Sequence, residues 1–343
     1  MTLKQKYRYL FGPVRSRRLG LSLGIDVIPS KTCTFNCTYC QLGRTTYQTV
    51  QREEYVPADE VMAELAMFLD TDGRADYLTF SGSGEPTLHS KLGAMIAGAQ
   101  RLSKIPVAVL TCSALMDDPQ VRRELAQAAV VLPSLDAASP KAFYAINRPH
   151  GRLYLAEIVN GLKHFREEYT GQIWLEIMLV KGVNDNDEEI ALLRRAIAEI
   201  RPDKVHLNTV VRPPAEGEAQ ALSEEELRLV QDRLGPPAEI IAEHAVAPAR
   251  TLDNRLIAEA LHLIARHPMT LEEISVYMNC KPEIIQVMLQ ALQETGEVKM
   301  REHCGQTFYL AALNEAGARE NNITRPRERL AAGQGSYAEL LLH

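Results

Sequence analysis

Short apolar runs alternate with segments of helical spacing over the first 234 residues of the 343-residue chain, and this alternation constrains the fold more than any other feature. Runs of this length separated by single helices predict parallel strands joined by right-handed crossovers. Six such units suit a partial (β/α)6 barrel, and a doubly wound open sheet is the alternative. The expected strands cover residues 21–28, 77–81, 106–111, 130–134, 173–180 and 204–210, and the expected helices 58–69, 91–102, 118–127, 140–169 with an interruption near 149–151, 187–200 and 224–234.

Three of the six cysteines lie within eight residues, directly after the first expected strand, at Cys33, Cys37 and Cys40. Three thiolates from one loop can hold three irons of a [4Fe-4S] cube and leave the fourth iron open to an exogenous amine and carboxylate. A structural zinc site is the alternative, but such sites close with four ligands and the nearest downstream histidine is the distant His89. A disulfide would need an oxidising compartment. Basic residues interrupt the first 20 positions, so we expect no signal peptide and a cytoplasmic location.

The spacing Cys-x3-Cys-x2-Cys, with Tyr39 just before the last cysteine, resembles the cluster loop of the radical S-adenosylmethionine superfamily. The resemblance implies a partial barrel fold, a [4Fe-4S] cluster and S-adenosylmethionine as cofactors, and an external electron donor. It also implies reductive cleavage of the sulfonium to a 5'-deoxyadenosyl radical, which abstracts hydrogen from a substrate. The sequence leaves that substrate open as a small molecule, an RNA or a protein.

Functional side chains of a barrel lie at the carboxyl ends of its strands. After the second expected strand, Ser83-Gly84-Glu85-Pro86 resembles the superfamily's Gly-Gly-Glu segment, which binds the methionyl ammonium, with Ser83 in place of the first glycine. By the same resemblance, Ser134 and Asp136 at the fourth strand end are expected to face the ribose or methionyl group. Glu176 in the fifth strand and Asn208 in the sixth complete the predicted cofactor-binding set.

Other polar residues near the expected strand ends have structural interpretations. Cys112, after the third strand, is expected to be a small buried residue rather than a radical donor. Arg15, Arg17 and Arg18 precede the first strand and are expected to form a solvated surface.

Within the superfamily, residues 12–20, 43–46, 81–88 and 210–214 are most similar to the 4-demethylwyosine synthase-like iron-sulfur oxidoreductases. The wyosine enzymes carry a second cluster on N-terminal cysteines, whereas no cysteine precedes Cys33 in this sequence. A radical enzyme of unidentified substrate is therefore expected. The alternatives are a wyosine-type tRNA-base enzyme, a glycyl-radical activating enzyme and a non-catalytic iron-sulfur regulator.

Residues 253–311 are expected to form three helices and a hairpin, in an arrangement that resembles a winged helix-turn-helix domain. Thr270 and Glu273 have the spacing of a capping box, and Cys280 and Cys304 are expected to pack rather than bind a cluster. Five basic residues against eight acidic ones argue against DNA binding and favour contact with protein or substrate. The net charge of −6 and the lack of a long apolar stretch argue against polyanion binding and a membrane span. The expected organisation is a barrel at 1–235, a linker at 236–252, this domain at 253–311 and a mobile tail at 312–343.

Overall fold

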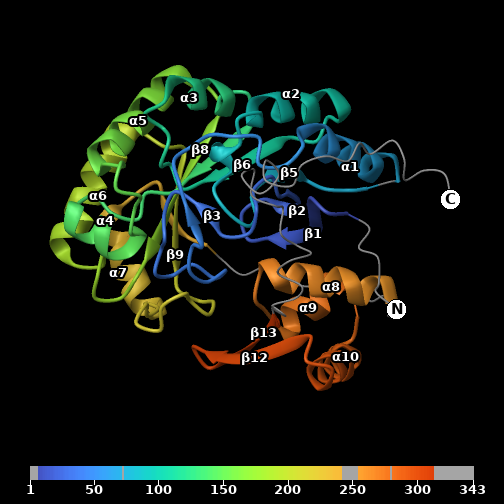
Figure 1. Ribbon diagram of the computed structural model, residues 1–343. Helices are drawn as coiled ribbons and strands as arrows, with labels where there is room; N and C mark the ends of the chain where they lie inside the picture. Colours follow the sequence, from blue (N-terminus) through green and yellow to red (C-terminus); the bar gives the residue numbers. More distant parts are fainter. Residues whose placement is uncertain (1–6, 72, 242–253, 279, 313–343) are drawn as a thin grey trace.

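The chain folds around one large, mostly parallel sheet, as a computed structural model that describes residues 7–71, 73–241, 254–278 and 280–312 shows (Figure 1). The strand order is β1-β2-β5-β6-β7-β8-β9-β10, and every neighbouring pair from β2 to β10 is parallel, whereas β1 runs antiparallel to β2. The strands are β1 (Leu10–Ser16), β2 (Gly20–Ile25), β5 (Tyr77–Phe80), β6 (Val107–Thr111), β7 (Val130–Pro133), β8 (Gln172–Leu179), β9 (Lys204–Thr209) and β10 (Ala238–Ile240).

Helices between these strands cover the outer face of the curved sheet, which makes the fold a partial (β/α) barrel (Figure 1). Along β8, buried residues alternate with half-buried ones: Ile173, Leu175 and Ile177 pack in the main core, whereas Trp174 belongs to a smaller cluster on the inner face. The helices are α1 (Ala58–Asp70), α2 (Leu92–Leu102), α3 (Pro119–Leu125), α4 (Pro140–Asn147), α5 (Leu155–Glu168), α6 (Asp187–Ile200) and α7 (Glu224–Leu234), with a 3-10 turn η1 (Pro86–Leu88).

Side-chain caps fix where several of these helices begin. The side chains of Asp118, Ser139, Asn186 and Ser223 each accept a hydrogen bond from a backbone N–H in the first turn of α3, α4, α6 and α7. Such caps satisfy backbone donors that the helix itself leaves unpaired. The interruption expected within 140–169 is the break between α4 and α5, where Arg148 has a left-handed backbone.

Two strands of the sheet were not expected from the sequence. β1 contains Pro13 and a register shift between Phe11 and Val14, so it lacks the regular alternation of a strand and lies at the sheet edge. The other, β10, has three residues and lies at the opposite edge. The predicted first strand is also too long, because β2 ends at Ile25 and a loop begins there.

The last described residues, 254–312, form a separate small unit that we call the C-terminal module. Its helices pack on a three-stranded antiparallel sheet of order β11-β13-β12, as the sequence predicted apart from the short β11. The winged-helix assignment stays a prediction, and residues 242–253 and 313–343, with most of the predicted linker and tail, lie outside the described residues. Within the described part of the chain, no helix has the length and apolar character needed to span a membrane. The elements are α8 (Asn254–Arg266), β11 (Met269–Thr270), α9 (Leu271–Met278), α10 (Pro282–Glu294), β12 (Val298–His303) and β13 (Gln306–Ala311).

Candidate active site

The three clustered cysteines lie on a loop at the carboxyl end of β2, which we call the cluster loop (residues 26–46). Its strand β3 (Thr32–Cys33) pairs with β4 (Tyr47–Gln48), which directly follows the loop, and Cys40 N–H donates to the carbonyl of Cys37 at 3.2 Å. The loop is also held from outside, because Thr38 N–H donates to the carbonyl of Ile146 at 2.9 Å. All three cysteines are half-buried. The backbone therefore fixes the positions of the sulfurs.

Neighbouring side chains donate to these sulfurs. Lys31 Nζ lies 3.2 Å from Cys40 Sγ, and Asn147 Nδ2 lies 3.5 Å from Cys37 Sγ. Burial raises the pKa of Cys37 well above that of a free thiol, whereas a hydrogen bond from Cys112 is the main cause that lowers the pKa of Cys33. Donors to sulfur stabilise thiolates and tune iron-sulfur clusters, so these residues fit a [4Fe-4S] cluster. Neither Lys31 nor Asn147 was identified from the sequence.

The histidine considered for a zinc site is engaged elsewhere. His89 is fully buried, its Nε2 lies 2.9 Å from the carbonyl of Val56, and its Nδ1 accepts from the backbone N–H of Lys91 at 3.1 Å. The described residues contain no group of three or more His, Cys, Asp or Glu side chains gathered around one metal ion. A cube does not require such convergence, since each thiolate binds a different iron.

The glycine-rich segment after β5, residues 81–88, forms a tight turn against the cluster loop; we call it the cofactor turn. Ser83 accepts from Lys31 N–H through its carbonyl at 2.8 Å, and its hydroxyl donates to Asp26 Oδ2 at 2.5 Å. A Cβ on Gly84 would overlap the carbonyl oxygen of Thr32 and the side chain of Ile28. Glycine is thus required at this position, where the turn meets the residue before Cys33.

We expect Gly84→Ala to disturb the cluster loop as well as the turn. The new Cβ pushes Thr32 away and costs about 1–3 kcal/mol in overpacking. The melting temperature and the iron content after anaerobic reconstitution should both fall. Gly217→Ala is the matched control, because a Cβ there meets no atom within 4 Å. Wild-type iron content in Gly84→Ala would contradict the close approach.

The side chain of Glu85 is held by hydrogen bonds within the protein. Its buried carboxylate accepts from the hydroxyl of Thr87 at 2.5 Å, from the hydroxyl of Thr111 at 2.6 Å and from Cys112 N–H at 2.7 Å. It therefore ties the end of β5 to the end of β6. The carboxylate of Glu85 is thus engaged by donors of the protein itself.

Asp136 gathers three donors at the mouth of the barrel. Its carboxylate accepts from the Tyr39 hydroxyl at 2.6 Å, from Asn147 Nδ2 at 2.6 Å and from Met178 N–H at 3.0 Å. Burial raises the pKa of Asp136, and the three hydrogen bonds oppose that rise. Asp136 thus links the cluster loop to β8. Nearby, Ser134 pairs through its backbone with Glu176 and accepts from Ser113 Oγ at its carbonyl.

Glu176 and Asn208 form a different group on the inner face of the barrel. Arg18 Nη1 donates to Glu176 Oε1, and Asn208 Nδ2 lies 3.3 Å from the same oxygen. The expectation that Arg18 is solvated is wrong, since its side chain is only 17% exposed. Burial raises the pKa of Glu176, but the Arg18 guanidinium outweighs it, so this pKa lies below the ordinary glutamate range. The β1–β2 turn carries Arg18 into the barrel, and no sequence pattern indicated that strand pair.

The Glu176 pair predicts a pH dependence of stability. A lowered pKa in the folded state means that ionised Glu176 stabilises the fold above the ordinary glutamate pKa, and that this contribution is lost as pH falls through the folded pKa. Glu176→Gln leaves the Arg18 charge buried, so we expect a loss of about 3 kcal/mol at neutral pH. The difference from wild type should shrink in acid, as measured by denaturant unfolding at several pH values. Glu224→Gln, at an exposed pair with Arg228, is the control, and a pH-independent difference would refute the assignment.

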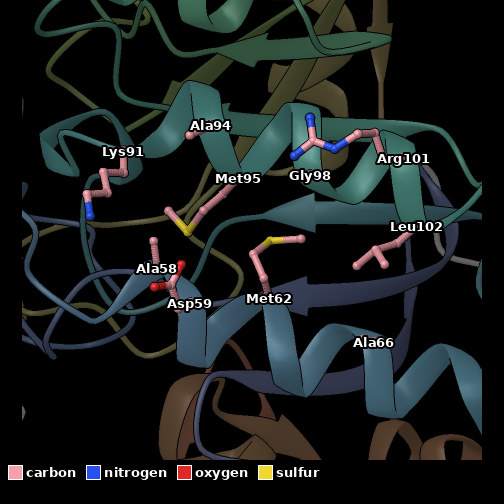
Figure 2. Close-up of a pocket in the computed structure, with 10 residues that line it drawn as sticks. All are labelled: Ala58, Asp59, Met62, Ala66, Lys91, Ala94, Met95, Gly98, Arg101 and Leu102. Atoms are coloured by element: carbon pink, nitrogen blue, oxygen red, sulfur yellow. The ribbon is translucent and has the colours of Figure 1, made fainter.

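A groove between α1 and α2 lies on the outer helical layer and not at the strand ends (Figure 2). Met62 and Met95 face one another across it, and Lys91 and Arg101 lie along its edge. None of the predicted site residues lines this groove, so it is not the cofactor site.

Comparison with known proteins places this geometry in a family. The Radical SAM superfamily profile matches residues 27–193, which include the three clustered cysteines and the cofactor turn. The UPF0026 protein MJ1312 of Methanocaldococcus jannaschii is 30% identical over 325 residues, which cover 92% of this chain and 99% of that protein. This chain belongs to the UPF0026 family. The match to the Radical SAM superfamily identifies the chain as an enzyme of that superfamily. Members of the superfamily bind a [4Fe-4S] cluster and S-adenosylmethionine, and they generally need an electron donor and a substrate.

Two further similarities are more distant or partial for this UPF0026 chain. The GTPase Obg of Brachyspira hyodysenteriae is 36% identical over 299 residues, which cover 86% of this chain and only 44% of that protein. The crystal structure of a radical SAM methyltransferase from Sphaerobacter thermophilus has 20% identity and a TM-score of 0.49, over 64% of this chain and 66% of the other.

Proposed function

We propose that this protein cleaves S-adenosylmethionine reductively at a cluster held by Cys33, Cys37 and Cys40, and acts on a polar substrate inside the barrel. The observation that supports this most is the meeting of the cluster loop and the cofactor turn at adjacent strand ends, with Gly84 against Thr32. When bound, the cluster and cofactor supply a 5'-deoxyadenosyl radical that abstracts hydrogen from a substrate. The protein's own residues position these groups and exclude water.

Each contact of the site has a task in this proposal. Lys31 and Asn147 stabilise the thiolates of Cys40 and Cys37 through hydrogen bonds. Backbone carbonyls of the cofactor turn accept from the methionyl ammonium, while Ser134 faces the ribose. Asp136 fixes Tyr39 and so orients the last turn of the cluster loop.

The inner face of the barrel favours a polar substrate. Beside Glu176, the Nε of Arg18 and the Nδ1 of His206 are buried and have no hydrogen-bond partner among the described residues. Buried polar atoms without a partner cost free energy unless water or a ligand pairs with them. We therefore assign Glu176 and Asn208, with Arg18, to the substrate side of the barrel rather than to the cofactor.

The decisive experiment is release of 5'-deoxyadenosine. Full-length protein reconstituted anaerobically with iron and sulfide should release 5'-deoxyadenosine from S-adenosylmethionine when dithionite is added, and not without dithionite. Iron binding without any release, together with tight binding of duplex DNA, would support the non-catalytic regulator and overturn the proposal. Transfer of a radical to a glycine of a partner protein, or modification of tRNA, would identify the glycyl-radical or wyosine-type alternative.

A further inference from the structure

Two consecutive residues at the end of α8 contact both halves of the candidate active site. Arg266 Nε donates to Asp26 Oδ2 at 2.9 Å, directly after β2. His267 Nδ1 lies 2.7 Å from Nε2 of Gln41, the residue that follows Cys40. Since an amide nitrogen only donates, His267 Nδ1 accepts in this pair.

The Arg266 contact extends to the cofactor turn. Asp26 is 5% exposed and accepts from Ser83 N–H at 3.1 Å and from the Ser83 hydroxyl at 2.5 Å. A Cβ on Gly82 would overlap the same carboxylate. A buried carboxylate needs a positive partner, and Arg266 supplies one from the C-terminal module.

The His267 contact extends to the cluster loop. His267 is close to Arg212 and Arg17, and burial with these guanidiniums lowers its pKa well below the usual value. The ring therefore stays neutral and keeps the Nδ1 lone pair that Gln41 needs. Any shift of His267 moves the acceptor of a side chain adjacent to a predicted iron ligand.

Other contacts hold the module against the β1 edge of the barrel and against the loop that follows β9. On the β1 side, Phe11 and Val14 pack against the module core. On the β9 side, His303 Nε2 lies 2.7 Å from the carbonyl of Val210, and Arg212 Nη2 lies 2.8 Å from Glu273 Oε1. Figure 1 shows the module lying along the side of the barrel, with α8 next to β1. The module thus contacts the barrel both at β1 and at the loop that follows β9.

The geometry points to Arg266 and His267 as positioning residues through which the C-terminal module sets the cofactor turn and the cluster loop. This inference rests on the proposed function, because it assigns the two segments to one cofactor site. It gives the module a role in catalysis that does not need nucleic acid.

The test compares full-length variants. Arg266→Ala and His267→Ala should each weaken binding of S-adenosylmethionine to the reconstituted protein at least tenfold by calorimetry. They should also alter the electron paramagnetic resonance change that the cofactor causes in the reduced cluster. Arg266→Lys, which keeps the charge beside Asp26, should recover most of the affinity. Arg233→Ala, which breaks an exposed pair with Asp187, should match wild type.

A readout without cofactors separates this inference from the proposed function. In cluster-free protein, amide hydrogen exchange over residues 26–46 and 81–88 should accelerate in Arg266→Ala and His267→Ala and not in Arg233→Ala. Unchanged exchange and unchanged cofactor affinity would overturn the positioning role, as would a lowered melting temperature with wild-type affinity. If wild-type protein releases no 5'-deoxyadenosine, the proposed function fails, and the exchange data still report whether the module orders the two segments.

Discussion

Replacing Cys33, Cys37 or Cys40 singly by alanine is expected to abolish the cluster and all release of 5'-deoxyadenosine. Each thiolate would bind a different iron, and a cube with two protein ligands lacks the anchoring that keeps it in the loop. Wild-type protein should hold about four irons per chain after anaerobic reconstitution. Iron and sulfide analysis, visible absorbance and electron paramagnetic resonance of the reduced protein measure the loss.

Two other cysteines provide matched controls for this prediction. Cys304→Ala removes an exposed thiol of the C-terminal module and should retain the cluster. Cys112→Ala is the more informative control, because the Cys112 thiol lies 3.0 Å from the Thr34 hydroxyl and contacts Cys33. Retention of four irons in Cys112→Ala would show that Cys112 is not a ligand of the fourth iron. Loss of iron there, or tight zinc without an iron chromophore in wild type, would contradict the open-iron argument.

Local sequence pattern predicted much of the barrel. The six expected strands and the helices between them are present. Buried parallel strands have continuous apolar sequences, and amphipathic helices have apolar residues at helical spacing, so both can be recognised locally. The three cysteines are close in sequence, so their spacing was enough to place the three thiols on one loop. β1 was not predicted because Pro13 and a bulge interrupt the alternation of side chains that is typical of a strand.

Long-range pairing of polar groups could not be read from the sequence. Arg18 and Glu176 are 158 positions apart, and Asp26 and Arg266 are 240 positions apart, so no local pattern connects them. Glu85 lies in the predicted turn, and its carboxylate accepts from the hydroxyl of Thr111 on β6, a contact that no local pattern predicts. A carboxylate near a strand end therefore predicts where a polar site lies but not which group the carboxylate binds. The packing of neighbouring strands decides that partner.

Asp136 provides the strongest test of that distinction, because the sequence suggests a ribose ligand and the structure shows a link between Tyr39, Asn147 and Met178. Asp136→Ala leaves three donors without their acceptor in a buried site, and we expect a destabilisation of about 3 kcal/mol. Asn147 also donates to Cys37, so the variant should lose iron. Its rate of 5'-deoxyadenosine release should fall at least 100-fold.

Thermal unfolding, iron content and calorimetric binding of S-adenosylmethionine together separate the two roles of Asp136. Tyr39→Phe removes one of the three hydrogen bonds and should cost only about 1 kcal/mol with most of the iron retained. Asp185→Ala, which removes a surface carboxylate that accepts from Gly182 N–H, should leave iron and cofactor affinity unchanged. If Asp136→Ala instead keeps wild-type stability and iron but binds the cofactor weakly, Asp136 is a direct ligand and the linking role is wrong. We expect the opposite order, in which loss of iron accompanies loss of stability, because Asp136 acts on the cluster loop through Tyr39 and Asn147.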